Sequence, residues 1–379
     1  MKVFSAQYFS GRGWSAQLPK WDSQSTLIIA FAAPEMADDQ TWFNDLKAQF
    51  PNSVITGCST AGEIFGESID DNSVSIAITR FEKTRLTVSS AKISSASNSI
   101  AAGEVLARPH IDADLKALFV ISEGLNVNGS ALVKGIGQVV SPSTIVTGGL
   151  AADGPNFKKT WVIHGDQIVS GVVTAVGFHG DAVHFSHGSQ GGWQIFGPER
   201  HITRSKGSVL YELDGQPALD LYKQYLGELA NELPSSGLLF PLQIRDKKNL
   251  GKPLVRTILA TDEKEKSMTF AGDLPEGWTA QLMRANFESL VDGASGAASQ
   301  TSIEDHHGPT LAIAISCVGR RLVLRERAEE EVEATLEKLP AETLQVGFYS
   351  YGEICPFEKL LNCELHNQTM TLTTIWEAA

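Results

Sequence analysis

The sequence predicts a mixed α/β fold of two domains, in which repeated β-α-β-turn-β units form mixed sheets covered by helices. Three observations support this prediction. Short continuous apolar runs, typical of buried strands, alternate with helix-like stretches. A glycine-rich segment follows the middle strand of each unit. The same order of elements recurs along the chain, which indicates an internal duplication.

The first unit is predicted at about residues 25–90. Residues 26–31 form a continuous apolar run, which favours a buried strand, and a helix over residues 39–50 is ended by Pro51. A second strand at 53–56 leads into Gly57-Cys58-Ser59-Thr60-Ala61-Gly62-Glu63-Ile64, and a third follows at 74–78. Glycine in such a segment permits positive φ and a close approach of the backbone to a ligand.

The second unit, at about residues 115–180, repeats this order. Its strands are predicted at 117–121, 144–147 and 171–178, with a helix over 129–140. Its glycine-rich segment begins at Gly148 and Gly149. Gly57 and Gly148 are 91 residues apart (148 − 57), and so are Leu27 and Leu118 (118 − 27), and this equal spacing favours duplication over chance.

A third unit is predicted near the end of the chain. Strands at 310–315 and 344–346 flank a charged helix over 326–339, and the last strand covers 369–375. The segment after the second strand is Gly347-Phe348-Tyr349-Ser350-Tyr351-Gly352-Glu353-Ile354, which resembles the segment that begins at Gly57.

The predicted boundary divides the chain into domains 1–215 and 216–379. Residues 191–243 are rich in glycine and form the predicted joint between the two halves. A helix is expected over 217–229, because proline is tolerated in the first turn of a helix. Residues 285–301 are small and polar, which fits either a loop or a weak helix.

Composition excludes several functional classes. The formal net charge is -13, and an acidic surface repels nucleic-acid phosphates and anionic lipid. We find no apolar run long enough to span a bilayer and no signal-peptide pattern at the start, so a cytoplasmic protein is expected. Four cysteines in 379 residues do not indicate a disulfide scaffold.

The first glycine-rich segment partly matches the sequence patterns of two catalytic motifs. Its two glycines have the spacing of a phosphate-binding loop, but Glu63 stands where that loop needs lysine, which argues against nucleotide hydrolysis. Ser59 follows a strand within Gly57-x-Ser59-x-Ala61, similar to a nucleophile elbow, so a serine hydrolase stays open as an alternative. No histidine lies in a recognisable partner motif for Ser59.

Other polar residues are candidates for ligand or metal contacts. Glu63 and Glu353 end matching segments, where each could bind a ligand amine, cap a helix or pair with an arginine. Cys355, Cys363 and His366 could supply three zinc ligands, but their spacing fits no standard zinc site.

Two groups of motifs resemble the FIST family. The segments starting at Gly57 and Gly148, with Ser186-His187-Gly188 and Leu213-Asp214-Gly215-Gln216-Pro217-Ala218, look like the FIST N-terminal domain. Cys317-Val318-Gly319-Arg320-Arg321, the segment from Gly347 to Ile354 and Leu365-His366-Asn367-Gln368-Thr369 look like the FIST C-terminal domain. The resemblance covers nearly the whole chain.

The resemblance implies a sensor of bacterial signal transduction rather than an enzyme. The chain is similar to the stand-alone subgroup that binds haem, senses nitric oxide and regulates a separate histidine kinase or other two-component protein. His366 and His187 are the expected iron ligands, because neutral imidazole commonly binds haem iron. The alternative is a haem-free sensor of an amino acid or other small metabolite, gripped by Arg320, Glu353 and Asn367.

The full set of expected ligand contacts follows from these motifs: Gly57, Cys58, Ser59, Thr60, Glu63, Gly148, Gly149, Arg320, Tyr351, Gly352, Glu353 and Asn367. The expected partners are the kinase and a gas or small molecule, with no nucleic acid and no membrane. The sequence also allows a homodimer.

Overall fold

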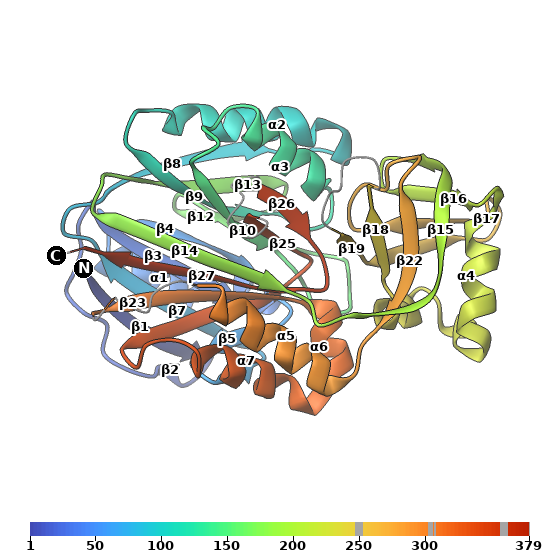
Figure 1. Ribbon diagram of the computed structural model, residues 1–379. Helices are drawn as coiled ribbons and strands as arrows, with labels where there is room; N and C mark the ends of the chain where they lie inside the picture. Colours follow the sequence, from blue (N-terminus) through green and yellow to red (C-terminus); the bar gives the residue numbers. More distant parts are fainter. Residues whose placement is uncertain (247–252, 302–305, 307, 357–362, 379) are drawn as a thin grey trace.

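The computed structural model describes residues 1–246, 253–301, 306, 308–356 and 363–378. Its larger part, here called the body, carries both chain termini. A smaller part, here called the inserted domain, runs from β15 (Gln194–Lys206) to β22 (Thr279–Arg284) and projects from one end of the body (Figure 1).

Three units of the same topology build the body. Unit 1 consists of β1 (Lys2–Phe9), β2 (Gly13–Trp14), β3 (Thr26–Ala32), α1 (Thr41–Gln49), β4 (Val54–Ser59), β5 (Glu63–Phe65), β6 (Ser68–Asp70) and β7 (Ser73–Arg80). Unit 2 consists of β8 (Arg85–Lys92), α2 (Ser99–Ala107), β9 (Leu115–Ser122), α3 (Gly129–Gly137), β10 (Ile145–Leu150), β11 (Val162–His164), β12 (Gln167–Val169) and β13 (Val172–His179). Unit 3 consists of β14 (Val183–Gln190), α5 (Phe287–Ser299), β23 (Thr310–Cys317), α6 (Val318–Leu324), α7 (Ala328–Leu336), β24 (Thr343–Ser350), β25 (Gly352–Pro356), β26 (Cys363–His366) and β27 (Met370–Glu377).

Each unit contributes a parallel strand pair with an antiparallel third strand. The pairs are β3–β4, β9–β10 and β23–β24, and β7, β13 and β27 run antiparallel beside their first members. Each sheet is then extended by a hairpin from another unit: β5–β6 joins β24, β11–β12 joins β4, and β25–β26 joins β10. Unit 1 thus extends the sheet of unit 3, unit 2 that of unit 1, and unit 3 that of unit 2. Every sheet of the body is therefore built from two units.

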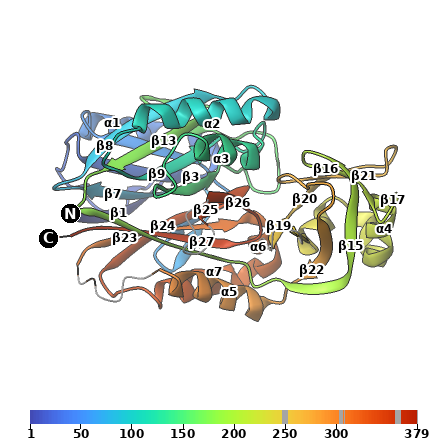
Figure 2. The same ribbon diagram turned by 45° about the horizontal axis from the view of Figure 1, so that its top comes forward.

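The inner faces of the three sheets share one core. Phe31, Phe119 and Ile315, from the first strand of each unit, are buried in the same cluster, and the ring of Phe31 stacks on that of Phe348 at 4.6 Å. Helices cover the outer faces: α1 packs on the sheet of unit 1, α2 and α3 on that of unit 2, and α5 and α7 on that of unit 3 (Figures 1 and 2).

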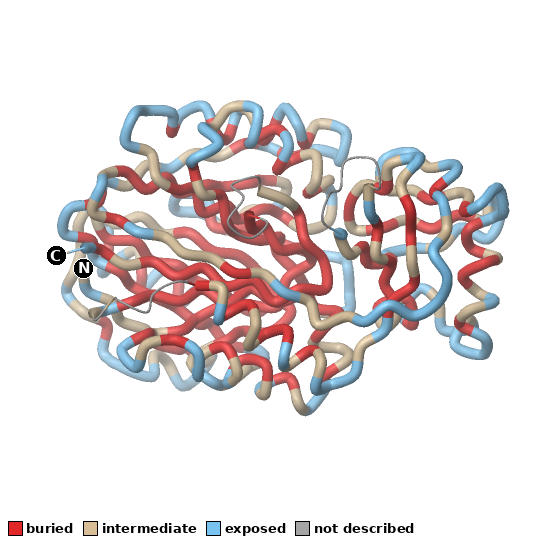
Figure 3. Tube along the Cα trace, viewed as in Figure 1, coloured by how far each residue is buried: buried red, intermediate tan, exposed pale blue. Residues whose placement is uncertain are grey.

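The inserted domain splits unit 3 between β14 and α5. It has its own core and one sheet, with the further elements β16 (Val209–Leu213), β17 (Gln216–Pro217), α4 (Ala218–Leu226), β18 (Leu242–Arg245), β19 (Leu254–Arg256), β20 (Ile258–Asp262) and β21 (Ser267–Phe270). Much of β15 is exposed, whereas the central strands of the body are buried (Figure 3). The boundary predicted at residue 215 therefore falls inside this domain, between β16 and β17.

Most predicted elements are present. Two predictions are corrected, and one open alternative is decided. The first glycine-rich segment is not a turn from its start, because β4 stays extended through Ser59. Ala30 pairs with Gly57 and Val120 with Gly148, so the first strands of units 1 and 2 are offset by 90 residues (120 − 30), not 91. Residues 285–301, expected as a loop or weak helix, contain α5.

The two ends of the described chain meet at the end of the body opposite the inserted domain (Figure 2). The amino group of Met1 lies 3.3 Å from a carboxylate oxygen of Glu377. Among the described residues, no helix has the length and apolar character that crossing a membrane requires.

Candidate functional site

The first glycine of each repeated segment is required by packing. Gly57, Gly148 and Gly347 each lie against the first strand of their own unit, and a Cβ atom there would come within 1.8 Å of a backbone carbonyl oxygen. Gly57 and Gly148 also have φ of 154° and 145°, which disfavours side chains. Glycine at these positions allows the two parallel strands of each pair to approach closely. The atoms that exclude a side chain there belong to the backbone of the paired strand.

The segments that follow these glycines meet one another. A ring of three backbone hydrogen bonds joins the three units, from Ala61 N to Tyr349 O (2.8 Å), from Ala152 N to Ser59 O (2.9 Å) and from Tyr351 N to Leu150 O (3.2 Å). The structure thus brings the predicted segments together, as a closed and buried junction.

Glu63 and Glu353 occupy equivalent places beside this ring. Glu63 accepts hydrogen bonds from the hydroxyl of Thr60 and from the amide and hydroxyl of Ser73. Glu353 accepts the same set from Ser350 and Thr369. Burial raises the pKa of each carboxyl to about 8, so the protonated form predominates at neutral pH. Through these hydrogen bonds, each glutamate fixes the backbone at the start of the third strand of its unit.

Arg320 is engaged inside unit 3. Its guanidinium lies 2.6 Å from Glu331, and both side chains are fully buried. It also donates to the carbonyl oxygens of Leu290 and Gly191. Arg320 therefore ties α6 to α5, α7 and the start of the connection to the inserted domain.

Ser59 does not occupy a nucleophile elbow. β4 ends at Ser59 and the chain continues into strand β5, whereas the elbow requires a helix there. The hydroxyl of Ser59 accepts a hydrogen bond from Trp161 N at 3.1 Å. The neighbouring thiol of Cys58 is fully buried, and burial raises its pKa well above the usual range. The hydrolase alternative thus lacks its structural context.

The remaining predicted contacts lie in the same interior. Tyr351 donates from its hydroxyl to Asp153, and its ring stacks on Phe157 at 4.4 Å. Asn367 donates to the carbonyl oxygen of His366, and its own Oδ1 is buried without a hydrogen-bond partner among the described residues. Gly149 and Gly352 pack against side chains of the core. None of the twelve predicted ligand contacts lines either cavity described below.

His366 and His187, the expected iron ligands, lie on either side of Cys355. Nε2 of His366 donates to the carbonyl oxygen of Cys355 at 3.0 Å, and Nδ1 of His187 lies 3.9 Å from its sulfur. Burial lowers the pKa of His366 to about 4 and also lowers that of His187, so both are neutral at pH 7. The cavity beside His366 measures about 210 Å³, below the roughly 300 Å³ at which ligand pockets begin. This volume counts against a haem beside His366.

Within the described residues, one group brings three metal-ligating atoms close together: Asp112, Asp114 and His179. Arg85 already pairs with both carboxylates, at 2.6 and 3.1 Å. Nδ1 of His179 hydrogen-bonds Asp112 at 2.8 Å. A guanidinium thus supplies the positive charge that a metal would bring to this group.

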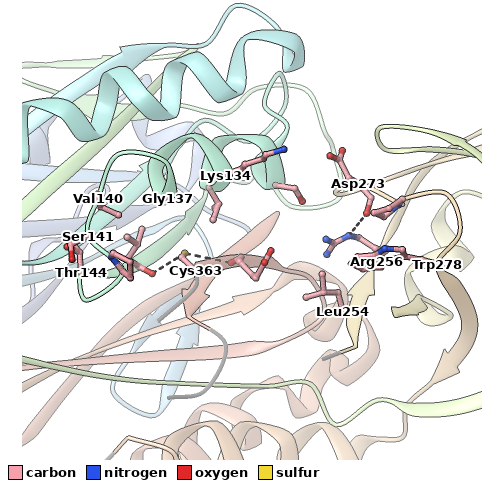
Figure 4. A pocket seen from close by; sticks show the side chains of 16 residues that line it. Lys134, Gly137, Val140, Ser141, Thr144, Leu254, Arg256, Asp273, Trp278 and Cys363 are labelled. Atoms are coloured by element: carbon pink, nitrogen blue, oxygen red, sulfur yellow. Dashed lines mark hydrogen bonds between the residues drawn. The ribbon is translucent and has the colours of Figure 1, made fainter. Parts of the chain in front are cut away.

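A larger cavity lies between the body and the inserted domain, here called the interdomain cavity (Figure 4). Its volume is about 370 Å³. Its walls combine apolar and charged side chains from α3, the α3–β10 connection, β10 and β26 of the body and from β19 and residues 273–278 of the inserted domain: Ser130, Val133, Lys134, Gly137, Val140, Ser141, Pro142, Thr144, Val146, Leu254, Arg256, Asp273, Pro275, Trp278, Cys363 and Glu364.

Arg256 is the buried cation of this cavity. Its side chain, on β19, is directed into the cavity (Figure 4), and the residue is 2% exposed. Burial lowers its pKa to about 10, so it remains charged at neutral pH. Within the described residues no carboxylate lies within salt-bridge distance of it, although the negative charges of Glu364 and Asp273 act on it from further away.

Asn128 and Asp273 join the two walls beside Arg256. Nδ2 of Asn128, which caps α3, donates to Asp273 of the inserted domain at 2.7 Å. Arg256 lies in no sequence motif, so motifs alone do not predict this site. The available signal was an arginine in an otherwise apolar strand, which is uncommon unless the charge is used.

Two family models match this chain. The FIST N domain matches residues 26–216 and the FIST C domain residues 218–356. An uncharacterized protein of Methanocaldococcus jannaschii is 25% identical over 82% of this chain, and the match spans 66% of that relative's own length. FIST domains are sensor domains of signal transduction that bind small ligands. The chain therefore belongs to the FIST family.

Proposed function

We propose that this chain is a ligand sensor and that its small ligand binds in the interdomain cavity. Its place in the FIST family supports the sensor role. The observation that carries the location is that both the body and the inserted domain line the cavity. A ligand that contacts both walls stabilises their docked arrangement, because a ligand shifts an equilibrium by binding one state better than the other.

The two chain segments that connect the body to the inserted domain can transmit a change in docking to the body. The two crossing segments run side by side, since Gln194 pairs with Arg284 and Ile195 with Met283. Arg320 holds the carbonyl of Gly191 at the start of the first crossing, and α5 begins directly after the second. A change in docking thus reaches α5 and α6. We propose that a separate cytoplasmic signalling protein, a histidine kinase or other two-component protein, reads this change.

A metabolite panel tests the proposal. Thermal unfolding of the full chain is measured with each compound, since a ligand that binds the native state raises the melting temperature. Gly137 lines the cavity, and a Cβ there meets no atom within 4 Å, so Gly137→Trp adds a large side chain at the cavity wall with little strain. A ligand of this cavity stabilises the wild type and Gly137→Ala but not Gly137→Trp. A panel without such a compound contradicts the proposal.

Haem with nitric oxide as signal is the second candidate. Its support is the neutral pair of half-buried His187 and buried His366 beside Cys355, and the 210 Å³ cavity stands against it. Haemin is titrated into the protein, and the absorption spectrum is recorded before and after reduction and nitric oxide. A sharp Soret band that His366→Ala or His187→Ala removes supports this candidate. A broad band like that of free haemin, unchanged in both variants, rejects it.

A further inference from the structure

The donors of Arg256 are divided between the protein and the cavity. Its Nε donates to the carbonyl oxygen of Asp273 at 3.1 Å, and its Nη1 donates to those of Val255 (3.1 Å) and Leu365 (3.2 Å). In the described part of the chain, Nη2 donates to no acceptor. Three neutral carbonyls therefore fix the guanidinium, and two N–H groups remain for a ligand.

Ser130 supplies a second donor without a protein partner. Its Oγ is buried and forms no hydrogen bond among the described residues. A Cβ at Gly272 would lie 2.9 Å from Nε of Arg256 and 3.0 Å from Oγ of Ser130, so the two groups face each other across this glycine. Gly272 has a φ of 133°, and its lack of a side chain leaves both groups room. A buried hydroxyl without a partner costs free energy unless something occupies it.

The charges of the lining indicate which ligand these donors suit. Arg256 and Lys134 are balanced by Asp273 and Glu364, and Asp273 is engaged by Asn128. A buried guanidinium bonded to carbonyls alone favours an anion at its open side. Two carboxylates in the same lining repel a second negative charge, which disfavours a dianion such as phosphate. The apolar walls formed by Val133, Val140 and Leu254 accommodate a hydrocarbon chain.

We propose that the ligand of the interdomain cavity is a small organic monocarboxylate, whose carboxylate accepts hydrogen bonds from Nη2 of Arg256 and Oγ of Ser130. This inference rests on the proposed sensor function and assigns the chemistry of its site. The carboxylate binds directly to the open side of the Arg256 guanidinium, which Glu364 and Asp273 influence only from beyond salt-bridge distance, while Lys134 and Glu364 contact the remainder of the ligand.

Sodium acetate, propionate and butyrate are the probes. Melting temperatures are compared with sodium chloride at equal ionic strength, with sodium phosphate and methyl propionate as further arms. We expect saturable stabilisation by at least one carboxylate and none by the ester or phosphate. Ser130→Ala keeps or slightly raises the stability of the free protein, because its Oγ has no hydrogen-bond partner among the described residues, yet weakens carboxylate binding about tenfold. Arg256→Lys weakens it further, and Ser299→Ala, on the exposed side of α5 and outside the cavity lining, leaves it unchanged.

Equal carboxylate binding in Ser130→Ala and the wild type overturns the inference, and so does stabilisation by the carboxylates that only matches chloride. Each failure is distinguishable from failure of the sensor proposal. If a panel compound without a carboxylate is blocked by Gly137→Trp and unaffected by Ser130→Ala, the sensor proposal stands and the carboxylate inference is rejected. If no compound is sensitive to Gly137→Trp, the sensor proposal itself is rejected.

Discussion

The amide of Ala152 donates a hydrogen bond of 2.9 Å to the carbonyl oxygen of Ser59, which joins the second unit of the body to the first. Two equivalent bonds complete the ring, and the exchanged hairpins follow directly after it in the chain. Small distortions at the first glycine of a segment therefore affect two sheets at once, because the strand before the ring and the hairpin after it belong to different sheets.

Gly347→Ala tests this junction. The added methyl would lie 1.8 Å from the carbonyl oxygen of Ala314, which is backbone within a parallel strand pair and has little room to move. We expect the free energy of unfolding to fall by more than about 3 kcal/mol. Urea denaturation measures the change.

Gly137→Ala is the matched control, because the new methyl meets no atom within 4 Å at the end of α3. It should be neutral or stabilising by up to about 1 kcal/mol. If Gly347→Ala unfolds at the same urea concentration as this control, the close contact is not what requires glycine at position 347.

Arg320→Met separates a structural from a ligand-binding role. Removing one partner of a buried ion pair leaves an uncompensated charge on Glu331, at a cost of about 3–5 kcal/mol. We expect this loss of stability in urea denaturation, with carboxylate stabilisation retained wherever the variant is folded. Adding Glu331→Leu should recover part of the loss. A folded Arg320→Met variant that binds no ligand would indicate that Arg320 takes part in ligand binding.

Patterns within one unit were predictable from sequence, and relations between units were not. β3, β9 and β23 are long apolar runs, so their strand character was visible in the residues themselves. The hairpin exchange was not visible, because the partner of a short strand such as β5 is chosen by packing in three dimensions. The insertion was also hidden, since β14 lies next to β27 in space but is separated from the rest of unit 3 by the inserted domain.

The candidate site shows the same limit. Glycine-rich motifs drew attention to Glu63 and Glu353, whose surroundings the structure shows to be closed sets of hydrogen bonds. Arg256 gains its role from carbonyls of the distant Leu365 and Asp273 and because no described carboxylate lies within salt-bridge distance of it. A local sequence pattern cannot show that a donor lacks an acceptor. This property of Arg256 arises only when the body and the inserted domain dock.

Glu353 makes stability depend on pH. Its pKa in the folded chain, about 8, lies above the ordinary value of 4.5. Between these values the folded state holds a proton that the unfolded state has lost, so stability decreases as pH rises through this window. Each such carboxyl contributes up to about 1.4 kcal/mol per pH unit. Glu353→Gln should reduce the slope measured by urea denaturation at pH 5, 6, 7 and 8.

Glutamine is neutral like the protonated carboxyl: its oxygen accepts from Thr369, and its amide donates to the Ser350 hydroxyl, which thereby changes from the donor to the acceptor of this bond. The exposed Glu337→Gln is the control, and its slope should match the wild type. A slope that Glu353→Gln does not alter would mean that Glu353 is ionised in the folded chain.

Asn128→Asp tests the link between the body and the inserted domain. Aspartate keeps the cap on Ala131 N, as good a cap as asparagine, but replaces the donor that faces Asp273 with a second carboxylate. Repulsion should loosen the docking of the two parts. We expect faster amide hydrogen exchange around residues 271–274, with the exchange of β3 and β23 unchanged, and weaker binding of any ligand of the interdomain cavity.

The double variant Asn128→Asp with Asp273→Asn is the decisive control. It reverses the direction of the hydrogen bond, since the amide of residue 273 now donates to the carboxylate of residue 128, and it restores the original count of charges. The backbone carbonyl of residue 273, which accepts from Arg256, is untouched. Exchange and ligand affinity should both return towards wild-type values. If the single variant is already like the wild type, the two parts are held together by other contacts, and the cavity does not depend on this link.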